Sequence, residues 1–166
     1  MLLAREAALR IGTILQFSVS NCDFNRRQIT GRTKRHASYT LPMTKRLYEK
    51  LLWCAAGARD ALEPLLAQYH TGERKTYEYA SLHRALRDTQ QAAGLRRGAW
   101  SFHDLRRTAA RELYQSTKDI RKVQRLLAHS NPWHTFWYLG NAGLDLDAED
   151  IEQVHAKPAR KDGTNG

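Results

Sequence analysis

The sequence predicts an α+β fold that is mainly helical, with a helical core and a small antiparallel β-sheet. Three observations predict it. Residues 1–16 and most of residues 43–99 place apolar side chains at the spacing of amphipathic helices. Residues 17–41 instead contain alternating, β-prone stretches, and residues 101–139 contain start signals for three more helices. With 166 residues, the chain is expected to form one domain with a substantial core.

The first segment, residues 1–16, is expected to form a single amphipathic helix. Its apolar positions are Leu2, Leu3, Ala7, Ile11, Ile14 and Leu15. Arg10 lies within this segment. On the helical pattern alone, Arg10 is a solvated charge on the outer face.

Two β-prone stretches, Gln28–Thr30 and Ser38–Leu41, flank a basic loop and are expected to pair as a hairpin. This hairpin supplies the small antiparallel sheet. The loop carries Arg32, Lys34 and Arg35, which could contact phosphate groups without taking part in chemistry.

Residues 43–99 are expected to be helical, with interruptions at Pro64 and around Gly72. Their core contacts are expected from Leu47, Leu51, Leu52, Leu62, Leu65 and Leu66. The last helix of this region is expected over residues 81–94, because Gly94 is typical of the residue that follows a helix end.

A helix start is predicted at Ser101, because Ser101 and Asp104 have the spacing of a capping box. His103 and Arg106 are three residues apart on this helix, so they project from one face. A second helix is expected to begin at Thr117 and to end before His129.

A third helix is predicted after Asn131 and Pro132, which are typical of an N-cap and a first-turn residue. Its apolar stripe is expected to consist of Trp133, Phe136 and Trp137. Tyr138 follows about 100° further round the helix. Its hydroxyl group is therefore expected to be free to face a substrate.

The charge balance predicts a polyanionic partner. The chain has 27 Lys and Arg residues against 17 Asp and Glu residues, a formal net charge of +10 and a pI near 9.9. Most of the basic residues are arginines, whose guanidinium groups bind phosphate through two hydrogen bonds at once. A basic, solvated surface without a partner is the alternative.

Composition also narrows the classes of site and location. Cys22 and Cys54 stand alone, without the spacing of metal ligands, and are expected to be buried or half-buried thiols in a reducing compartment. We therefore expect no structural metal site. No apolar run is long enough to suggest a membrane span, and no secretory signal is evident at the N-terminus. A cytoplasmic protein without membrane contact is expected.

Four polar residues near the C-terminal end have spacings typical of a reaction site. His103, Arg106, His129 and Tyr138 are separated by 3, 23 and 9 residues. Each alone is commonly a packing or capping residue. Together they resemble the tyrosine recombinases of the phage-integrase family, whose catalytic domain carries HxLR, then LGHS, then a nucleophilic tyrosine at these intervals.

The resemblance extends more loosely to the N-terminal part. Residues 8–13, ALRIGT, are similar to the family segment G-L-R-x-[GS]-E, with Ala8 in place of glycine and Thr13 in place of glutamate. It implies that Arg10 is the first catalytic arginine. Lys34 matches the catalytic lysine of the family pattern T-K-x(7)-P-L, because Pro42 follows at that interval. A loop that contacts phosphate without chemistry remains the alternative for Lys34.

The resemblance implies a role for each of these residues. Tyr138 would attack a DNA phosphate, Arg10 and Arg106 would hold its oxygens, and His103 would take or share the tyrosine proton. His129 would donate a hydrogen bond to a phosphate oxygen, and Lys34 would protonate the leaving 5′ oxygen. Arg32, Arg35 and Arg107 are expected to contact DNA. No metal or other cofactor is expected, because the aspartates at 23, 104 and 119 are scattered.

The family further implies the catalytic-domain fold of a tyrosine recombinase over residues 1–155, without the N-terminal DNA-clamping domain, and a disordered tail over residues 156–166. Its partner would be double-stranded DNA, in integration or excision of a mobile element. A tetrameric synapse is expected, with a helix capped by Asp145 or Asp147 docked on a neighbouring protomer. Two alternatives stay open: a DNA-binding protein that has lost its chemistry, and a type IB topoisomerase-like nicking-closing enzyme.

Overall fold

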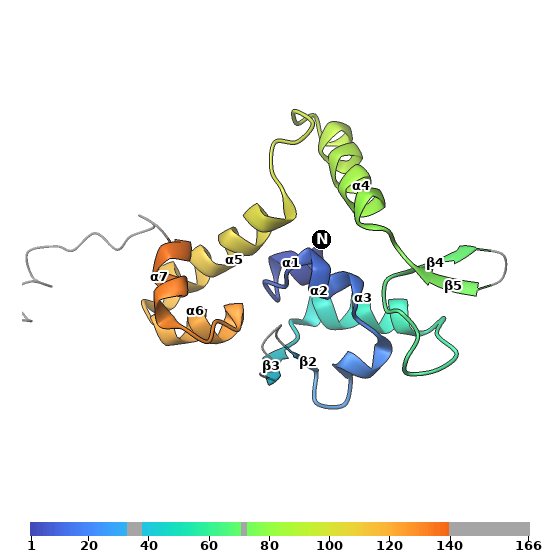
Figure 1. The fold of residues 1–166 in the computed structure, drawn as a ribbon, viewed down its shortest axis with the longest axis horizontal. Coiled ribbons are helices and arrows are strands. Elements are labelled where there is room, and N and C mark those ends of the chain that lie inside the picture. Colours follow the sequence, from blue (N-terminus) through green and yellow to red (C-terminus); the bar gives the residue numbers. More distant parts are fainter. Residues whose placement is uncertain (33–37, 71–72, 140–166) are drawn as a thin grey trace, which may run out of the picture.

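A computed structural model describes residues 1–32, 38–70 and 73–139. The chain is mainly helical and has a three-stranded and a two-stranded antiparallel sheet, which confirms the mainly helical α+β class (Figure 1). In chain order the elements are α1 (Leu2–Arg5), α2 (Ile11–Leu15), a 3₁₀ turn (Val19–Asn21), β1 (Cys22–Asp23), β2 (Gln28–Arg32), β3 (Ser38–Pro42), α3 (Lys45–Ala55), β4 (Ala67–His70), β5 (Glu73–Thr76), α4 (Tyr79–Ala92), α5 (Phe102–Thr117), α6 (Ile120–Leu127) and α7 (Pro132–Leu139).

The expectation of one helix over residues 1–16 is wrong, because two short helices, α1 and α2, replace it. Ala8 between them has a left-handed backbone (φ 49°), and Arg10 is extended at the N-cap of α2. The amide of Leu9 donates to the carbonyl of Leu3 at 3.0 Å and closes the end of α1. Both helices direct apolar residues into the core. The helical spacing of apolar residues in the sequence therefore continues across the break and does not reveal it.

The predicted hairpin is confirmed and is slightly longer than expected. Strand β2 pairs antiparallel with β3, placing Ile29 opposite Leu41, and β1 adds a third strand beside β2. Ile29 and Leu41 are buried on the face that packs on the helices. Lys34 and Arg35 lie outside the described residues.

The middle of the chain differs from its sequence prediction. Helix α3 begins after the N-cap Thr44, whose hydroxyl accepts from the Leu47 amide at 3.1 Å. The chain between α3 and α4 contains the predicted interruptions, but the residues between Pro64 and the Gly72 region are not helical: β4 pairs antiparallel with β5, with Ala67 opposite Thr76. Figure 1 shows this two-stranded hairpin at one end of the molecule. Its strands are short and polar, so they carry no clear hydrophobic alternation.

Helix α4 ends as the sequence predicts. Gly94 has a positive φ of 73° just beyond it. The buried Gln90 donates to the Trp100 carbonyl at 2.6 Å and accepts from the Gly98 amide at 2.7 Å. These two bonds hold the connection that leads to α5.

The three C-terminal helices begin at the predicted signals. Ser101 and Asp104 form the capping box of α5. Helix α6 begins at Ile120, three residues later than expected, because Asp119 is its N-cap. At the start of α7, the Asn131 side chain accepts from the Trp133 amide at 2.9 Å. The helix predicted after Asp145 or Asp147 lies outside the described residues.

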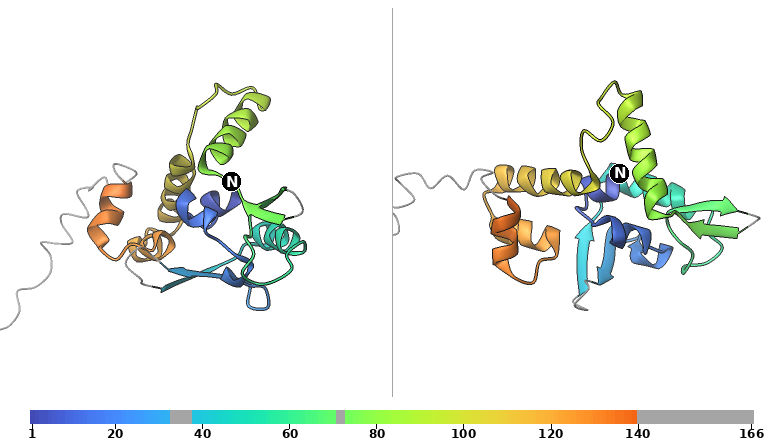
Figure 2. Two further views of the ribbon diagram at one scale, coloured as in Figure 1. Left: turned by 45° about the vertical axis from the view of Figure 1, so that its right-hand side comes forward. Right: turned by 45° about the horizontal axis from the view of Figure 1, so that its top comes forward.

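Two clusters of buried apolar residues support the fold. The larger cluster contains residues of helices α1, α2, α3 and α4 and of the three-stranded sheet. The smaller cluster lies within the C-terminal three-helix group, α5, α6 and α7, around Val123 and Leu127, and it includes Ala8. Figure 2 shows that α5 extends from its packing against α6 and α7 toward α1. The chain around residue 8 therefore lies where the two clusters meet.

The stripe predicted for α7 is wrong. Trp133 and Phe136 are 68% and 37% exposed, whereas Thr135 and Leu139 are fully buried. Thr135 and Leu139 are one turn apart, so they share a face of the helix, and Leu139 belongs to the smaller cluster. The side chain of Trp137 lies outside the described part of the chain. Aromatic character therefore did not indicate the buried face of this helix.

Cys22 and Cys54 are half-buried free thiols, as predicted. Within residues 1–32, 38–70 and 73–139, no helix combines the length and apolar character needed to cross a membrane.

Candidate active site

Five of the predicted site residues come together from four parts of the chain. Arg10 stands at the N-cap of α2, His103 and Arg106 on α5, His129 just after α6, and Tyr138 on α7. The Nε2 atom of His129 lies 3.4 Å from Nη2 of Arg10 and 3.5 Å from Nη2 of Arg106. Segments separated by more than 100 residues thus meet around one imidazole.

Arg106 is a buried cation held by the backbone. It is 3% exposed. Its guanidinium donates to the Ala8 carbonyl through Nη1 and to the Leu127 carbonyl at 2.7 Å through Nη2. Burial and the nearby Arg10 lower the pKa of Arg106 to about 10, so it stays charged at neutral pH. Its Nε lacks a hydrogen-bond partner among the described residues.

Arg10 is exposed and completes a pair of cations at His129. Two guanidinium groups converging on one atom repel each other, and an anion bound between them would relieve that repulsion. Both groups retain donors for such an anion, since each guanidinium carries five N–H groups. The arrangement can therefore bind an oxyanion such as a phosphate diester.

His129 is a neutral imidazole at neutral pH. Burial, followed by the charges of Arg106 and Arg10, lowers the pKa of its ring to about 4. Its Nδ1 lies 3.1 Å from the Thr135 hydroxyl oxygen. Its backbone is fixed by Gln124, whose carbonyl accepts from the His129 amide at 3.1 Å and whose side chain donates to the His129 carbonyl at 2.9 Å.

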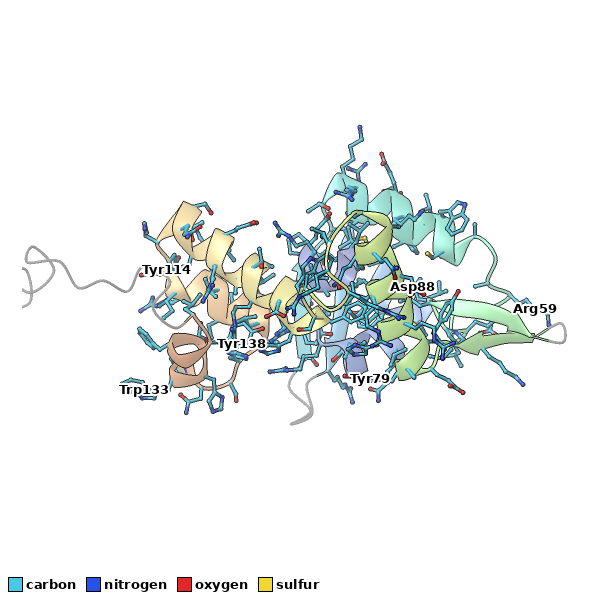
Figure 3. All side chains as sticks on the ribbon, turned by 90° about the horizontal axis from the view of Figure 1, so that it is seen from above. Arg59, Tyr79, Asp88, Tyr114, Trp133 and Tyr138 are labelled. Atoms are coloured by element: carbon cyan, nitrogen blue, oxygen red, sulfur yellow. The ribbon has the colours of Figure 1, made fainter. Side chains whose placement is uncertain are left out.

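Tyr138 lies between the two site histidines. Its ring centroid is 5.1 Å from that of His103 and 5.7 Å from that of His129, both in edge-to-face geometry. Its hydroxyl donates to the His103 carbonyl at 3.4 Å. Figure 3 shows Tyr138 on the side of α7 toward α5, whereas Trp133 points to the outer edge of the molecule.

Tyr138 and His103 are both uncharged at neutral pH. Burial raises the pKa of the Tyr138 phenol, and the opposing effect of Arg106 does not cancel it. Burial and the charges of Arg107 and Arg106 lower the pKa of His103. A neutral imidazole can accept a proton that a neutral phenol must lose before it acts as a nucleophile.

The residues predicted to contact DNA divide into three cases. Arg107 is half-buried, with its guanidinium carbon 5.9 Å from the centre of the Tyr138 ring. Arg32 ends β2 and lines an open pocket of about 610 Å³ between α2 and the sheet. Lys34 and Arg35 fall outside the described residues. DNA contact stays a prediction for all three arginines, and so does the catalytic role of Lys34.

Two groups in the site could not be predicted from the sequence. Thr135 lies beside His129 and is fully buried, but a threonine on a short helix gives no signal of such a role. The carbonyl of Ala8 is bound by Arg106, and a backbone group is visible only in the structure. Within the described part of the chain, no group of three or more His, Cys, Asp or Glu residues is arranged to hold a metal ion.

Comparison with known proteins identifies the family. The model of the phage integrase family matches residues 1–143. A probable integrase/recombinase, YoeC of Bacillus subtilis (strain 168), is 40% identical over 67 residues, which are 40% of this chain and 36% of YoeC. The chain thus spans about a third of the length of this curated relative.

Two solved structures share the fold. The XerA recombinase superposes with a TM-score of 0.68 at 18% identity, over 95% of this chain and 56% of XerA. The XerH site-specific recombinase, in a pre-cleavage complex with its difH substrate, also gives 0.68 at 18% identity, over 94% of this chain and 44% of XerH. At this identity the likeness shows the fold alone.

Proposed function

Because this chain belongs to the phage integrase family, we propose that it is the catalytic domain of a site-specific DNA recombinase, which cuts and rejoins strands through a phosphotyrosyl bond. The observation that carries the proposal is the meeting of Arg10 and Arg106 at His129, beside the hydroxyl of Tyr138. A phosphate-binding pair of cations next to a neutral phenol suits tyrosine attack on a phosphodiester.

In the cleavage step, the Tyr138 oxygen attacks the scissile phosphorus and the bond to the 5′ oxygen breaks. The 3′ end of the cut strand becomes a phosphotyrosyl diester, and the other end leaves as a 5′ hydroxyl. Arg10 and Arg106 stabilise the negative charge on the non-bridging oxygens, since both are permanently charged donors. His129 donates a further hydrogen bond to one of these oxygens.

Two proton transfers accompany the exchange of bonds. The phenol proton goes to His103, whose lowered pKa leaves its ring free to accept it. The leaving 5′ oxygen takes a proton from Lys34. In the reverse step, a 5′ hydroxyl attacks the phosphotyrosyl bond, so that the strand is rejoined without ATP.

We propose double-stranded DNA as the partner and the integration or excision of a mobile element as the setting. The net charge of +10 supports a polyanionic partner. In its solved structure, the Tn1549 transposon integrase, which has a similar fold, is in complex with transposon right end DNA. We further propose that residues 1–155 form the catalytic unit. On DNA, four copies would assemble, with the segment after Tyr138 docked on a neighbour.

The test is covalent trapping on a nicked suicide DNA substrate that carries the ends of the element. Wild-type protein is expected to give a DNA-linked band on a denaturing gel, and Tyr138→Phe is expected to give none. Tyr114→Phe is the matched control, because Tyr114 is also a half-buried tyrosine of the three-helix group but lies apart from Tyr138 (Figure 3). It should form the adduct as wild type does.

Other outcomes identify the alternatives. DNA binding without any adduct in the wild-type protein would favour a DNA-binding scaffold that has lost its chemistry. An adduct accompanied by relaxation of supercoiled DNA of any sequence would favour a topoisomerase-like nicking-closing enzyme.

A further inference from the structure

We propose that Thr135 is a positioning residue, whose buried hydroxyl holds the His129 ring with Nε2 directed at the two site arginines. Thr135 is fully buried on α7, and its Oγ1 lies 3.1 Å from Nδ1 of His129. It precedes Tyr138 by three residues on the same helix, so one helix turn carries both the nucleophile and the support for His129. The expected effect on catalysis rests on the proposed function. The contact between Thr135 and His129 does not depend on that function.

The contacts of His129 determine which ring nitrogen carries the proton in the free protein. Nε2 faces Nη2 of Arg10 at 3.4 Å and Nη2 of Arg106 at 3.5 Å. Guanidinium groups only donate, so Nε2 must accept and the ring proton must be on Nδ1. The ring is neutral at pH 7 because its pKa is about 4. Nδ1–H therefore donates to the Thr135 hydroxyl.

A bound phosphate reverses these roles. Its oxygens take the arginine donors, and His129 must then donate from Nε2, which leaves Nδ1 without a proton. A hydroxyl group both donates and accepts, so Thr135 can turn its hydrogen toward Nδ1 and keep the bond. Among the described residues, His129 is the hydrogen-bond partner of this hydroxyl. Serine could serve both states, whereas valine, which has nearly the same shape, could serve neither.

Nuclear magnetic resonance of the free protein tests the proposal without any DNA. The His129 ring signals are those that vanish in His129→Gln. In wild type and Thr135→Ser, we expect a protonated Nδ1, an unprotonated Nε2, and an Nδ1–H proton that exchanges slowly with water. In Thr135→Val, we expect that proton to exchange too fast for detection. A wild-type ring protonated on Nε2, or an Nδ1–H signal that survives unchanged in Thr135→Val, would overturn the proposal.

Covalent trapping gives the catalytic consequence. The rate of adduct formation is expected to fall about fivefold to tenfold in Thr135→Val, the size expected for one lost neutral hydrogen bond, and to stay within about twofold of wild type in Thr135→Ser. Thr89→Val on α4 is the control, since the Thr89 hydroxyl donates to the carbonyl of Ala85 in the same helix. Equal rates for Thr135→Val and Thr89→Val would contradict the role. If wild type forms no adduct, the proposed function fails, and the resonance experiment still decides the role of Thr135.

Discussion

Arg106 donates a hydrogen bond to the backbone carbonyl of Ala8, a residue 98 positions earlier whose backbone is left-handed. The second carbonyl that Arg106 binds belongs to Leu127, next to Ala128, which is also left-handed with a φ of 48°. The family motifs carry glycine at the positions of Ala8 and Ala128. Both replacements of glycine by alanine thus occur where the backbone turns sharply beside the buried guanidinium.

Glycine substitution should separate the backbone strain from side-chain packing at these alanines. A left-handed alanine costs about 1 kcal/mol, and a buried methyl group contributes ~0.8 kcal/mol. Ala128 is half-buried, so Ala128→Gly is expected to raise the free energy of unfolding by about 0.5 kcal/mol. Ala8 is fully buried, so Ala8→Gly is expected to be nearly neutral, because the two effects cancel. Urea denaturation measures both.

Ala110→Gly is the matched control for this comparison. Ala110 is fully buried in the same cluster but lies within the helix α5. There glycine loses the methyl contact and also the helical preference, so a loss of about 2 kcal/mol is expected. If Ala8→Gly cost as much as Ala110→Gly, the left-handed strain at Ala8 would be absent.

The two site arginines should respond differently to replacement by lysine. Arg106→Lys puts one nitrogen in place of the two that bond the carbonyls of Ala8 and Leu127, so one of these bonds is expected to be lost. A buried carbonyl left unpaired costs about 1–3 kcal/mol of unfolding free energy. Arg10 is exposed, so Arg10→Lys is expected to leave stability within about 0.5 kcal/mol of wild type. Both variants should lower adduct formation, by about 100-fold or more, because an ammonium lacks the planar fork with which a guanidinium holds two phosphate oxygens in a fixed geometry. Thermal unfolding and covalent trapping are the two measurements.

Equal loss of stability in the two variants would contradict the burial of Arg106. Full activity in Arg10→Lys would instead remove Arg10 from the phosphate site.

Stability should fall as the pH drops through the titration of His129. The pKa of the folded ring, about 4, is below its ordinary value of 6.5, so the unfolded chain binds more protons between these pH values. The free energy of unfolding should therefore be highest above about pH 6.5 and decrease toward pH 4. Because solvent screens this half-buried ring, the loss is expected to be on the order of 1 kcal/mol.

The measurement is urea denaturation at a series of pH values. His129→Gln should show a smaller slope between pH 4 and 6.5 and run parallel to wild type above pH 7. The remaining slope should include His103, whose pKa is lowered as well. Identical slopes for wild type and His129→Gln would show that His129 is not held in its neutral form by the fold.

Local signals in the sequence predicted much of this fold. The spacing of Ser101 and Asp104 gave the start of α5, and the β-prone stretches around Ile29 and Leu41 gave the hairpin. The motif spacing also indicated which polar residues meet. Of these, His103, Arg106 and Tyr138 lie on helices whose starts are marked by capping residues in the sequence. Such features depend on residues within a few positions of each other.

The features that the sequence did not predict depend on tertiary contacts. The break at Ala8 is invisible in a continuous apolar pattern, and this left-handed residue lies where the two clusters meet. The buried face of α7 is set by Thr135 and Leu139, although Trp133 and Phe136 are more hydrophobic than Thr135. The hydrophobic pattern alone therefore does not reveal which face of this helix packs on α5 and α6.

The pairing of Gly31 with Tyr39 allows a last prediction about the sheet beneath α2. These residues are directly opposite on β2 and β3, and the Tyr39 ring covers the glycine. A Cβ added at Gly31 would lie 2.6 Å from Cζ of Tyr39, so the ring would have to move. Gly31→Ala is expected to lower the free energy of unfolding by about 1–3 kcal/mol, as overpacking does.

A double-mutant cycle with Tyr39→Phe shows whether the ring is responsible. The buried Tyr39 hydroxyl has no hydrogen-bond partner among the described residues, so Tyr39→Phe alone should not destabilise the protein. It also removes the atom that Gly31→Ala meets first, so the alanine should cost less in the Tyr39→Phe background. Gly12→Ala in α2 is the control, since no atom of the residues that the structure describes outside this turn of helix lies within 4 Å of the Cβ position. There alanine should raise the free energy of unfolding by about 0.5–1 kcal/mol, because it favours the helix. Additive effects of Gly31→Ala and Tyr39→Phe would show that the Tyr39 ring does not pack on Gly31 in solution.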